Sequence, residues 1–413
     1  MGQEYSTTSY SVIAEGSITT PKGFKAGGLH CGLKKTTRHD LGAIVCDVPA
    51  AAAGVYTTNV FQAAPLQVTR DSIGSDGMLR AVIVNSGNAN AVTGKQGEAD
   101  AYEMRSRFAE SIGVEADQVA VASTGVIGEL LKMDKVRDGI DALPAKLASD
   151  REAADGFCQA ILTTDLVQKM VCVSVEIDGQ LVHIAGASKG SGMIHPNMAT
   201  MLGFVTTDAA ISSAALQQLL RKATDYTFNM ITVDGDTSTN DMLVAMASGL
   251  AGNRELTPEH ECWEAFAAGL RYVCEVLAKA IARDGEGATK LVEVQVRGAV
   301  SDDSARAIAK TVIGSSLVKS AVFGADANWG RIIAAVGRAG EPVHPETVDV
   351  RLGDILTLEQ SRPVAFDEEE ALEYLKGDTV VIHVDLHMEE GSATAWGCDL
   401  TYDYVRINAA YRT

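Results

Sequence analysis

The sequence is poor in aromatic residues, in basic residues relative to acidic ones, and in long apolar runs. Phe, Trp and Tyr make up 5% of the 413 residues, so a hydrophobic core has to be built from small aliphatic side chains. No apolar run approaches the ~20 residues that a membrane-spanning helix needs. Lys and Arg number 35 against 54 Asp and Glu, and the resulting net charge of −19 disfavours nucleic acid as a partner.

Cysteine is present but follows no pattern. The seven cysteines are scattered, their number is odd, and no Cys-x-x-Cys occurs. They suggest neither a disulfide framework nor a zinc site, and they fit the reducing cytosol best. Residues Met1–Tyr10 are polar and lack the apolar segment of a secretory signal. We therefore expect a cytoplasmic globular protein.

Strand-like and helix-like segments interleave without a strict βαβ order. Strands are predicted at 80–85, 119–123, 291–296 and 380–388, and helices at 98–112, 212–224, 241–248, 258–282 and 303–312. This pattern predicts an α+β fold of layered sheets with covering helices, like an αββα sandwich, followed by a smaller C-terminal α/β domain. The polar, glycine-flanked loop Arg283–Gly287 is the expected boundary between a catalytic domain, 1–283, and the C-terminal domain, 284–413.

A β-hairpin is the clearest local prediction. Residues 171–177 alternate between apolar and polar side chains, Asp178-Gly179 follows, and an apolar strand returns over 180–185. Asp-Gly between such runs indicates a type I′ turn, because both central residues need positive φ. The hairpin delivers the chain into the segment Lys189–Thr200.

Three interpretations of Lys189–Thr200 are open. Its glycines and serines are typical of a tight loop. A phosphate-binding loop fails, because Lys189 precedes Gly190 instead of following the last glycine. The third interpretation is self-cleavage, in which a Thr hydroxyl attacks the preceding carbonyl and Thr becomes a new N-terminus whose amine activates its own hydroxyl. Ala199 is small enough to allow that attack, and Pro196 suggests a constrained backbone.

Motifs spread over nearly the whole chain resemble those of the ornithine acetyltransferase family. The matching stretches are 85–90 (NSGNAN), 123–128 (STGVIG), 163–165 (TTD), 189–202 (KGSGMIHPNMATML), 234–241 (DGDTSTND), 323–326 (FGAD), 328–331 (NWGR) and 408–413 (NAAYRT). Any one of these stretches could be chance, but their number and order are specific.

The resemblance implies a role for each matching site residue. Thr200 would be the nucleophile and Ala199–Thr200 the scissile bond, giving chains 1–199 (α) and 200–413 (β). Thr124 and Gly125 would form the oxyanion hole. The substrate would contact Thr163 or Thr164, Lys189, Thr200, Glu286, Asn408 and Thr413.

The activity implied by the resemblance is acetyl transfer in arginine biosynthesis. Thr200 would take acetyl from N2-acetyl-L-ornithine and pass it to L-glutamate, with no bound cofactor or metal. Some family members also use acetyl-CoA as the donor, and the two fragments would assemble as a heterotetramer. A self-cleaving amidohydrolase or aminopeptidase and a non-catalytic small-molecule binding protein are the alternatives.

Other polar clusters have simpler interpretations than a functional site. The loop with Asp234, Asp236 and Asp241 lacks the glycine and glutamate of an EF-hand, so we expect it to cap a helix that starts at Asp241. His383, Asp385 and His387 could chelate zinc from one strand face, but a solvated face is favoured, because Val384, Leu386 and Met388 define the buried one.

Two single residues have both a functional and a plain interpretation. His195, near the predicted cleavage site, could shuttle protons or could be an ordinary loop histidine. From the sequence of its loop alone, Glu286 would be an exposed loop glutamate. The resemblance instead implies that it binds the substrate ammonium.

Overall fold

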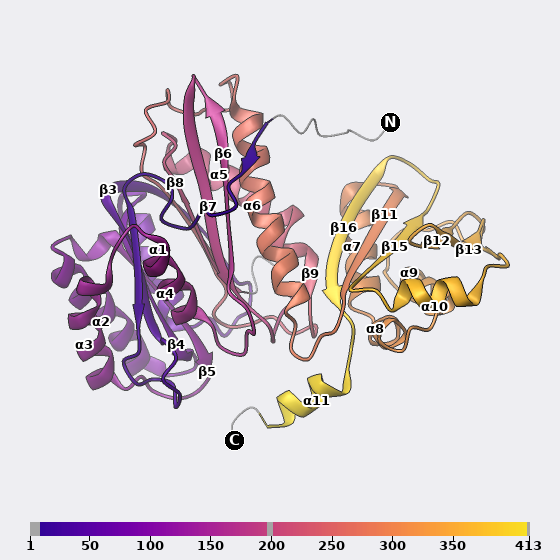
Figure 1. Cartoon of the computed structure of the whole chain (residues 1–413), viewed down its shortest axis with the longest axis horizontal. Coiled ribbons are helices and arrows are strands. Elements are labelled where there is room, and N and C mark those ends of the chain that lie inside the picture. Colours follow the sequence, from indigo (N-terminus) through magenta and orange to yellow (C-terminus); the bar gives the residue numbers. More distant parts are fainter. Residues whose placement is uncertain (1–8, 196–200, 411–413) are drawn as a thin grey trace. The chain divides into compact units, whose positions relative to one another are not determined.

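The computed structural model describes residues 9–195 and 201–410, which form parts of two compact units (Figure 1). Unit 1 contains Met1–Gly190, Asn197–Asp225 and Thr237–Leu277, and unit 2 contains Ser191–Pro196, Tyr226–Asp236 and Ala278–Thr413. Neither unit is one continuous stretch of chain, and the expected boundary after Arg283 stays a prediction. Within these described residues no helix combines the length and the apolar character needed to cross a membrane.

Unit 1 is built on one mixed sheet. The sheet has the order β1-β6-β7-β8-β10-β3-β4-β5, and β2 pairs with β3. The strands are β1 (Ser11–Val12), β2 (Phe24–Leu29), β3 (Leu41–Tyr56), β4 (Met78–Asn88), β5 (Val119–Val126), β6 (Lys169–Ile177), β7 (Gln180–Lys189), β8 (Leu202–Thr207) and β10 (Met242–Ala247). The pairs β4–β5 and β8–β10 are parallel, whereas β3–β4 and β6–β7 are antiparallel.

Helices cover both sides of this sheet. They are α1 (Ala64–Asp76), α2 (Gly94–Ile112), α3 (Met133–Ala142), α4 (Arg151–Ile161), α5 (Ser213–Tyr226) and α6 (Trp263–Arg283), with short 3₁₀ turns at Ala116–Gln118 and Leu143–Lys146. The division between the units falls inside α6, after Leu277. The predicted helices 98–112 and 212–224 are confirmed as α2 and α5, whereas α6 begins later than the predicted residue 258.

The two faces of β3 line two different cores. Ala43 and Val45 pack with Phe108 of α2 in one buried cluster, which α1 and α3 also line. Ile44 points the opposite way, into a cluster that holds Phe157 of α4 and Phe204 of β8. The rings of those two Phe residues meet edge to face at 5.4 Å. Alternation along β3 thus directs neighbouring side chains into two separate buried clusters.

Helix α6 packs against one face of the hairpin strands β6 and β7. A methyl group added at Gly186 would lie 2.7 Å from Leu277 Cδ1, and one added at Gly269 would lie 2.9 Å from Val175 Cγ2. Side chains are therefore absent where helix and sheet approach most closely. The helices lie outside the sheet and bury their apolar side chains in common clusters with it. This arrangement confirms the predicted α+β fold with covering helices.

The predicted hairpin is confirmed residue by residue. Strands β6 and β7 pair antiparallel from Lys169 with Ser188 to Ile177 with Gln180. Asp178 and Gly179 have φ of 53° and 72°, as a type I′ turn requires. The alternating pattern and the turn residues together therefore predicted this register.

The helix predicted over 241–248 is wrong. Residues Met242–Ala247 form β10, which is buried along its whole length between β8 and β3. A short strand with neighbours on both edges and both faces covered shows no apolar–polar alternation, so its sequence cannot be told from a buried helix. The expectation that Asp241 is at a helix cap is wrong for the same reason.

Unit 2 is built on a second mixed sheet of order β14-β13-β12-β15-β11-β16-β9. Its strands are β9 (Ile231–Thr232), β11 (Leu291–Ala299), β12 (Asp349–Leu352), β13 (Ile355–Glu359), β14 (Arg362–Pro363), β15 (Thr379–Asp385) and β16 (Gly391–Cys398). Its helices are α7 (Asp302–Ile313), α8 (Ser316–Phe323), α9 (Trp329–Gly337), α10 (Glu368–Leu375) and α11 (Tyr402–Ala409), with a 3₁₀ turn at Phe228–Met230. The strand-rich C-terminal region and the helix near 303–312 are confirmed.

Candidate active site

The segment around the predicted cleavage bond leaves and re-enters the sheet of unit 1 at adjacent positions. β7 ends at Lys189, β8 begins at Leu202, and these two residues are antiparallel partners. Met201 is 3% exposed, and its carbonyl accepts a hydrogen bond of 2.9 Å from the Met242 N–H. Ala199 and Thr200 lie outside the described residues, and so does Thr413.

Thr124 and Gly125 lie at the end of β5, beside Ser86 and Gly87 of β4. Gly125 has φ of +136°, a conformation that side chains disfavour. A Cβ atom there would lie 2.4 Å from the Gly87 carbonyl carbon. The fold therefore requires glycine at the second predicted oxyanion-hole position.

Lys189 contacts Thr124 directly. Its Nζ atom donates a hydrogen bond of 3.2 Å to Thr124 Oγ1, and the two residues are 7% and 9% exposed. An ammonium group can only donate, so the Thr124 hydroxyl accepts here and its own hydrogen remains available for another acceptor. That arrangement suits a hydroxyl that has to donate to a developing oxyanion.

Asp165 holds the start of the segment that follows Lys189. Its carboxylate accepts hydrogen bonds from Lys169 Nζ at 2.8 Å, Gly190 N at 2.7 Å and Thr163 N at 3.0 Å. Burial alone would raise the pKa of Asp165, but the charges of Lys189 and Lys169 and these hydrogen bonds hold it below its ordinary value. Asp165 is therefore an anion, and it anchors the backbone at Gly190.

Some residues near Thr124 carried no clear signal in the sequence. Burial and the charge of Lys189 lower the pKa of Lys34 to about 8, although Asp40 opposes the shift. Lys34 lies in a long loop, and its Nζ donates to the His39 carbonyl at 2.6 Å. Only the tertiary fold brings this lysine near Lys189. The i,i+4 spacing of Asp165 and Lys169 could have indicated an ion pair.

In unit 2, Glu286 is buried and contacts another predicted substrate residue. It is 7% exposed, and its Oε2 accepts a hydrogen bond of 2.8 Å from Asn408 Nδ2. A Cβ atom on Gly192 would lie 2.3 Å from the Glu286 carboxyl carbon, so glycine leaves the space that this side chain fills. The Glu286 N–H donates to the Ser191 carbonyl at 3.0 Å. The interpretation of Glu286 as an exposed loop residue is therefore wrong.

The backbone before residue 196 is held by unit 2. Asp234 accepts hydrogen bonds from the N–H groups of Met193 at 2.6 Å and Ile194 at 2.8 Å. Met193 has φ of +56°, which is unusual for a residue with a side chain. His195 Nδ1 lies 3.0 Å from Thr232 Oγ1. The constraint expected around the cleavage segment is thus present in its described part.

Three comparisons with known proteins place the chain in a family. The model of the ArgJ family matches residues 25–413. The chain belongs to the ArgJ family.

Individual members are similar over almost the full length. The arginine biosynthesis bifunctional protein ArgJ of Geobacillus kaustophilus is 60% identical over 408 residues, which are 98% of each chain. The protein of the same name from Halalkalibacterium halodurans is 58% identical over 402 residues, 97% of each chain. The crystal structure of ArgJ from Bacillus halodurans, at 2.00 Å resolution, matches with a TM-score of 0.50 and 61% identity, covering 50% of this chain and 98% of that one.

Membership of the ArgJ family confirms the resemblance found in the sequence motifs. The expectation of an acetyltransferase of arginine biosynthesis is confirmed with it. The individual site residues, including the choice between Thr163 and Thr164, stay predictions.

The acidic loop that holds Asp234 and Asp241 has a structural use. Among residues 9–195 and 201–410, no three His, Cys, Asp or Glu side chains are placed to hold a metal ion. Asp234 is engaged by backbone N–H groups, and Asp241 is 3% exposed. Burial raises the pKa of Asp241 well above its ordinary value, against the opposing effects of Ser238 and Lys189. Burial therefore favours the protonated form of the Asp241 carboxyl group.

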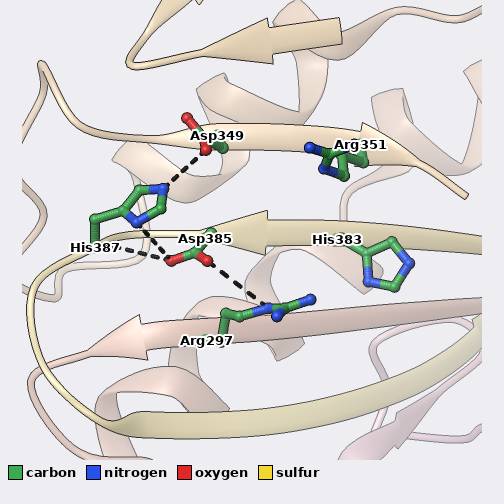
Figure 2. Close-up of a pocket in the computed structure, with 6 residues that line it drawn as sticks. All are labelled: Arg297, Asp349, Arg351, His383, Asp385 and His387. Atoms are coloured by element: carbon green, nitrogen blue, oxygen red, sulfur yellow. Dashed lines mark hydrogen bonds and ion pairs between the residues drawn. The ribbon is translucent and has the colours of Figure 1, made fainter. Parts of the chain in front are cut away.

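His387, which follows β15, takes part in a network of ion pairs with Asp349 and Asp385 (Figure 2). Six side chains line a cavity of about 260 Å³, namely Arg297, Asp349, Arg351, His383, Asp385 and His387. His387 Nε2 lies 2.8 Å from Asp349 Oδ2, and Arg297 Nε lies 3.8 Å from Asp385 Oδ2. His387 is exposed and His383 and Asp385 are half-buried, whereas Val384 and Leu386 are fully buried on the other face; Met388 is half-buried, so the predicted division holds for all of these residues except Met388.

Proposed function

We propose that this chain cleaves itself between Ala199 and Thr200 and then moves acetyl from N2-acetyl-L-ornithine to L-glutamate. In the first step the Thr200 hydroxyl attacks the Ala199 carbonyl, the peptide nitrogen leaves, and water hydrolyses the resulting ester. Thr200 is left with a free α-amine, which serves as the base for its own hydroxyl. The processed chains are 1–199 and 200–413.

Acetyl transfer then follows a ping-pong route. Thr200 Oγ attacks the acetyl carbonyl, the C–N bond breaks, and ornithine leaves with the proton on its amine. The α-amine of glutamate attacks the acetyl ester, takes the acetyl group and returns the proton to Thr200 Oγ. Both half-reactions pass through a tetrahedral oxyanion, so the same donors can serve both.

The hydrogen bond from Lys189 to Thr124 is the observation that carries this proposal. It leaves the Thr124 hydroxyl free to donate beside a glycine with φ of +136°, and both residues end a buried strand. A half-buried strand end with a directed donor is a suitable oxyanion site.

Substrate contacts are carried over to residues whose chemistry fits. An acetylated ornithine presents a carboxylate, an amide and a side-chain ammonium. Lys189 suits the carboxylate, Glu286 the ammonium, and Asn408 can both donate and accept. The burial of Glu286 and its bond to Asn408 support this assignment, to which Thr163 or Thr164 and Thr413 are added from the family motifs.

Processing is also supported by the length of the solved relative. The crystallised chain from Bacillus halodurans is 98% covered, yet it corresponds to 50% of this chain. A single break after Ala199 would produce two pieces of nearly equal length. We extend the proposal to an assembly of two α and two β fragments in the cytoplasm, where the seven free cysteines would stay reduced.

Intact-mass analysis of purified protein tests the proposal. Wild type should give two fragments, with Thr at the new N-terminus, whereas Thr200→Ala should stay whole. N2-acetylornithine should add one acetyl group to the 200–413 fragment, and glutamate should remove it as N-acetylglutamate. Removal by water alone would favour an amidohydrolase, and cleavage of Thr200→Ala at the same bond would contradict the nucleophile assignment. Supplying acetyl-CoA in place of N2-acetylornithine tests the second donor.

A further inference from the structure

Asn240 uses its side-chain amide to hold two strand ends of unit 1. It is 5% exposed, and its Nδ2 donates to the carbonyls of Ala89, after β4, and of Ser123, in β5. Its Oδ1 accepts a hydrogen bond of 2.6 Å from Thr239 Oγ1. Both amide hydrogens and one oxygen lone pair are thus in use, which fixes the orientation of the group.

These contacts enclose the predicted oxyanion donors. The Ser123 carbonyl belongs to the same planar peptide group as the Thr124 N–H, so holding one orients the other. On the far side of Gly125, the Ala89 N–H donates to the Val126 carbonyl at 2.9 Å. Thr124 and Gly125 therefore lie between two peptide groups whose carbonyls, at Ser123 and Val126, are hydrogen-bonded. Asn240 holds the first carbonyl directly. Asn240 also binds the carbonyl of Ala89, the residue whose N–H holds the second.

The segment that carries Asn240 is itself fixed. Thr57 Oγ1 donates to the Ser238 carbonyl at 2.8 Å, and the Ala63 N–H donates to the Thr239 carbonyl at 2.9 Å. Two residues after Asn240, the Met242 N–H binds the carbonyl of Met201, which follows Thr200 in the chain. One rigid segment thus contacts the strand of the oxyanion donors and the strand that begins after the nucleophile.

We propose that Asn240 is a positioning residue for acyl transfer, because its amide holds the Ser123–Thr124 peptide group and so fixes the backbone that carries the Thr124 hydroxyl donor. The inference rests on the proposed function, in which these donors stabilise the oxyanion. Asn240 acts through Thr124 and Gly125 and does not need to touch the substrate. Its loss should therefore affect the chemical steps more than substrate binding.

Asn240→Ala is the first test. A displacement of the donors should lower kcat by about 10–100-fold, less than the ~10²–10³ expected for deleting a donor outright. KM for N2-acetylornithine and for glutamate should stay close to wild type. Self-cleavage should slow as well, since the same donors serve it. Thr239→Val, which removes the hydrogen bond to Asn240 Oδ1, should give a smaller loss in the same direction and replaces Asn240→Ala if that variant does not fold.

Asn253→Ala is the matched control. Asn253 is 7% exposed, and its amide donates to the carbonyls of Ala210 and Arg254 and accepts from the Ala210 N–H. Loss of its amide removes a comparable set of buried hydrogen bonds away from Thr124. We expect a similar loss of thermal stability in Asn253→Ala with unchanged kcat.

A double-mutant cycle with Thr124→Ala separates positioning from general destabilisation. If Asn240 acts through the Thr124 donor, Asn240→Ala should lower kcat much less in the Thr124→Ala background than in wild type. Three results would overturn the positioning role alone. They are a double variant whose kcat falls by the product of the two single effects, a wild-type kcat for Asn240→Ala, and an equal loss of kcat in Asn253→Ala. Absence of acetyl transfer in wild type would overturn the proposed function instead, and the role of Asn240 with it.

Discussion

Replacing Lys169 by Met should destabilise the protein strongly, because it breaks a fully buried ion pair. Lys169 Nζ and Asp165 Oδ1 are 2.8 Å apart, and both side chains are 0% exposed. Removing one partner of such a pair leaves an uncompensated buried charge, which typically costs about 3–5 kcal/mol. Here the N–H groups of Gly190 and Thr163 still bind Asp165, and Lys189 still opposes its charge. We therefore expect about 3 kcal/mol, at the lower end of that range.

The destabilisation of Lys169→Met should depend on pH in a defined direction. The pKa of Asp165 is held below its ordinary value of 3.8, so the folded carboxylate contributes stability above that pH and loses it as pH falls. The difference between wild type and variant should be fully present at pH 7 and shrink progressively as pH falls below about 4, toward the lower pKa of the folded Asp165 carboxyl group. Urea unfolding of both proteins at several pH values measures this difference, provided that the dependence of the unfolding free energy on urea concentration is the same for both.

Arg151→Met provides the control for this experiment. Arg151 and Asp155 have the same i,i+4 spacing and a distance of 2.9 Å, but their side chains are 49% and 35% exposed. Exposed pairs of this kind are worth about 0.3–0.5 kcal/mol. A loss below about 1 kcal/mol for Lys169→Met, or one equal to that of Arg151→Met, would refute the reasoning that burial makes the first pair indispensable.

Three further outcomes are expected. Thr124→Ala should lower kcat by ~10²–10³ with an unchanged circular dichroism spectrum, and near wild-type turnover would remove the hydroxyl from the mechanism. Glu286→Gln should lower kcat/KM for N2-acetylornithine by about tenfold while self-cleavage proceeds, since cleavage involves no free substrate, and unchanged kinetics would end the proposed contact. Burial and Lys310 lower the pKa of His195 to about 4, against an opposing effect of Asp236. The free energy of unfolding should therefore fall by about 1–2 kcal/mol as pH drops from 6.5 to 4. Urea midpoints that fall equally in His195→Gln would contradict this.

Features that depend on neighbours in the sequence were predictable. Asp178-Gly179 specified a turn with two positive φ values, and the strands on either side pair in the register that this turn imposes. The start of β5 was also predictable from the apolar run at 119–123, although the strand continues through Thr124-Gly125 to Val126. Each of these predictions needed only a few consecutive residues, whose conformations are restricted by their own side chains or by the lack of one.

Features that depend on distant parts of the chain were not predictable from the sequence. β10 reads as a helix or a strand until β3 and β8 are known to flank it. Glu286 reads as an exposed loop residue, because its burial comes from Gly192 and Asn408, which are far away in the sequence. Lys34 reads as one of many surface lysines, and only the packed loop brings it under the influence of Lys189. Burial of a charged residue is a tertiary property, so a local pattern cannot report it.

The acidic motif 234–241 shows how a polar cluster can be built for backbone contacts. Its carboxylates raised the question of a metal loop, and a helix cap at Asp241 was the expectation. Asp234 instead binds the N–H groups of Met193 and Ile194, and Asn240 binds the carbonyls of Ala89 and Ser123. A carboxylate can only accept and an amide can also donate, so each residue type matches the backbone group that it meets. The motif therefore fixes backbone within each unit, through Asp234 in unit 2 and Asn240 in unit 1, which gives short polar residues a structural use at these positions.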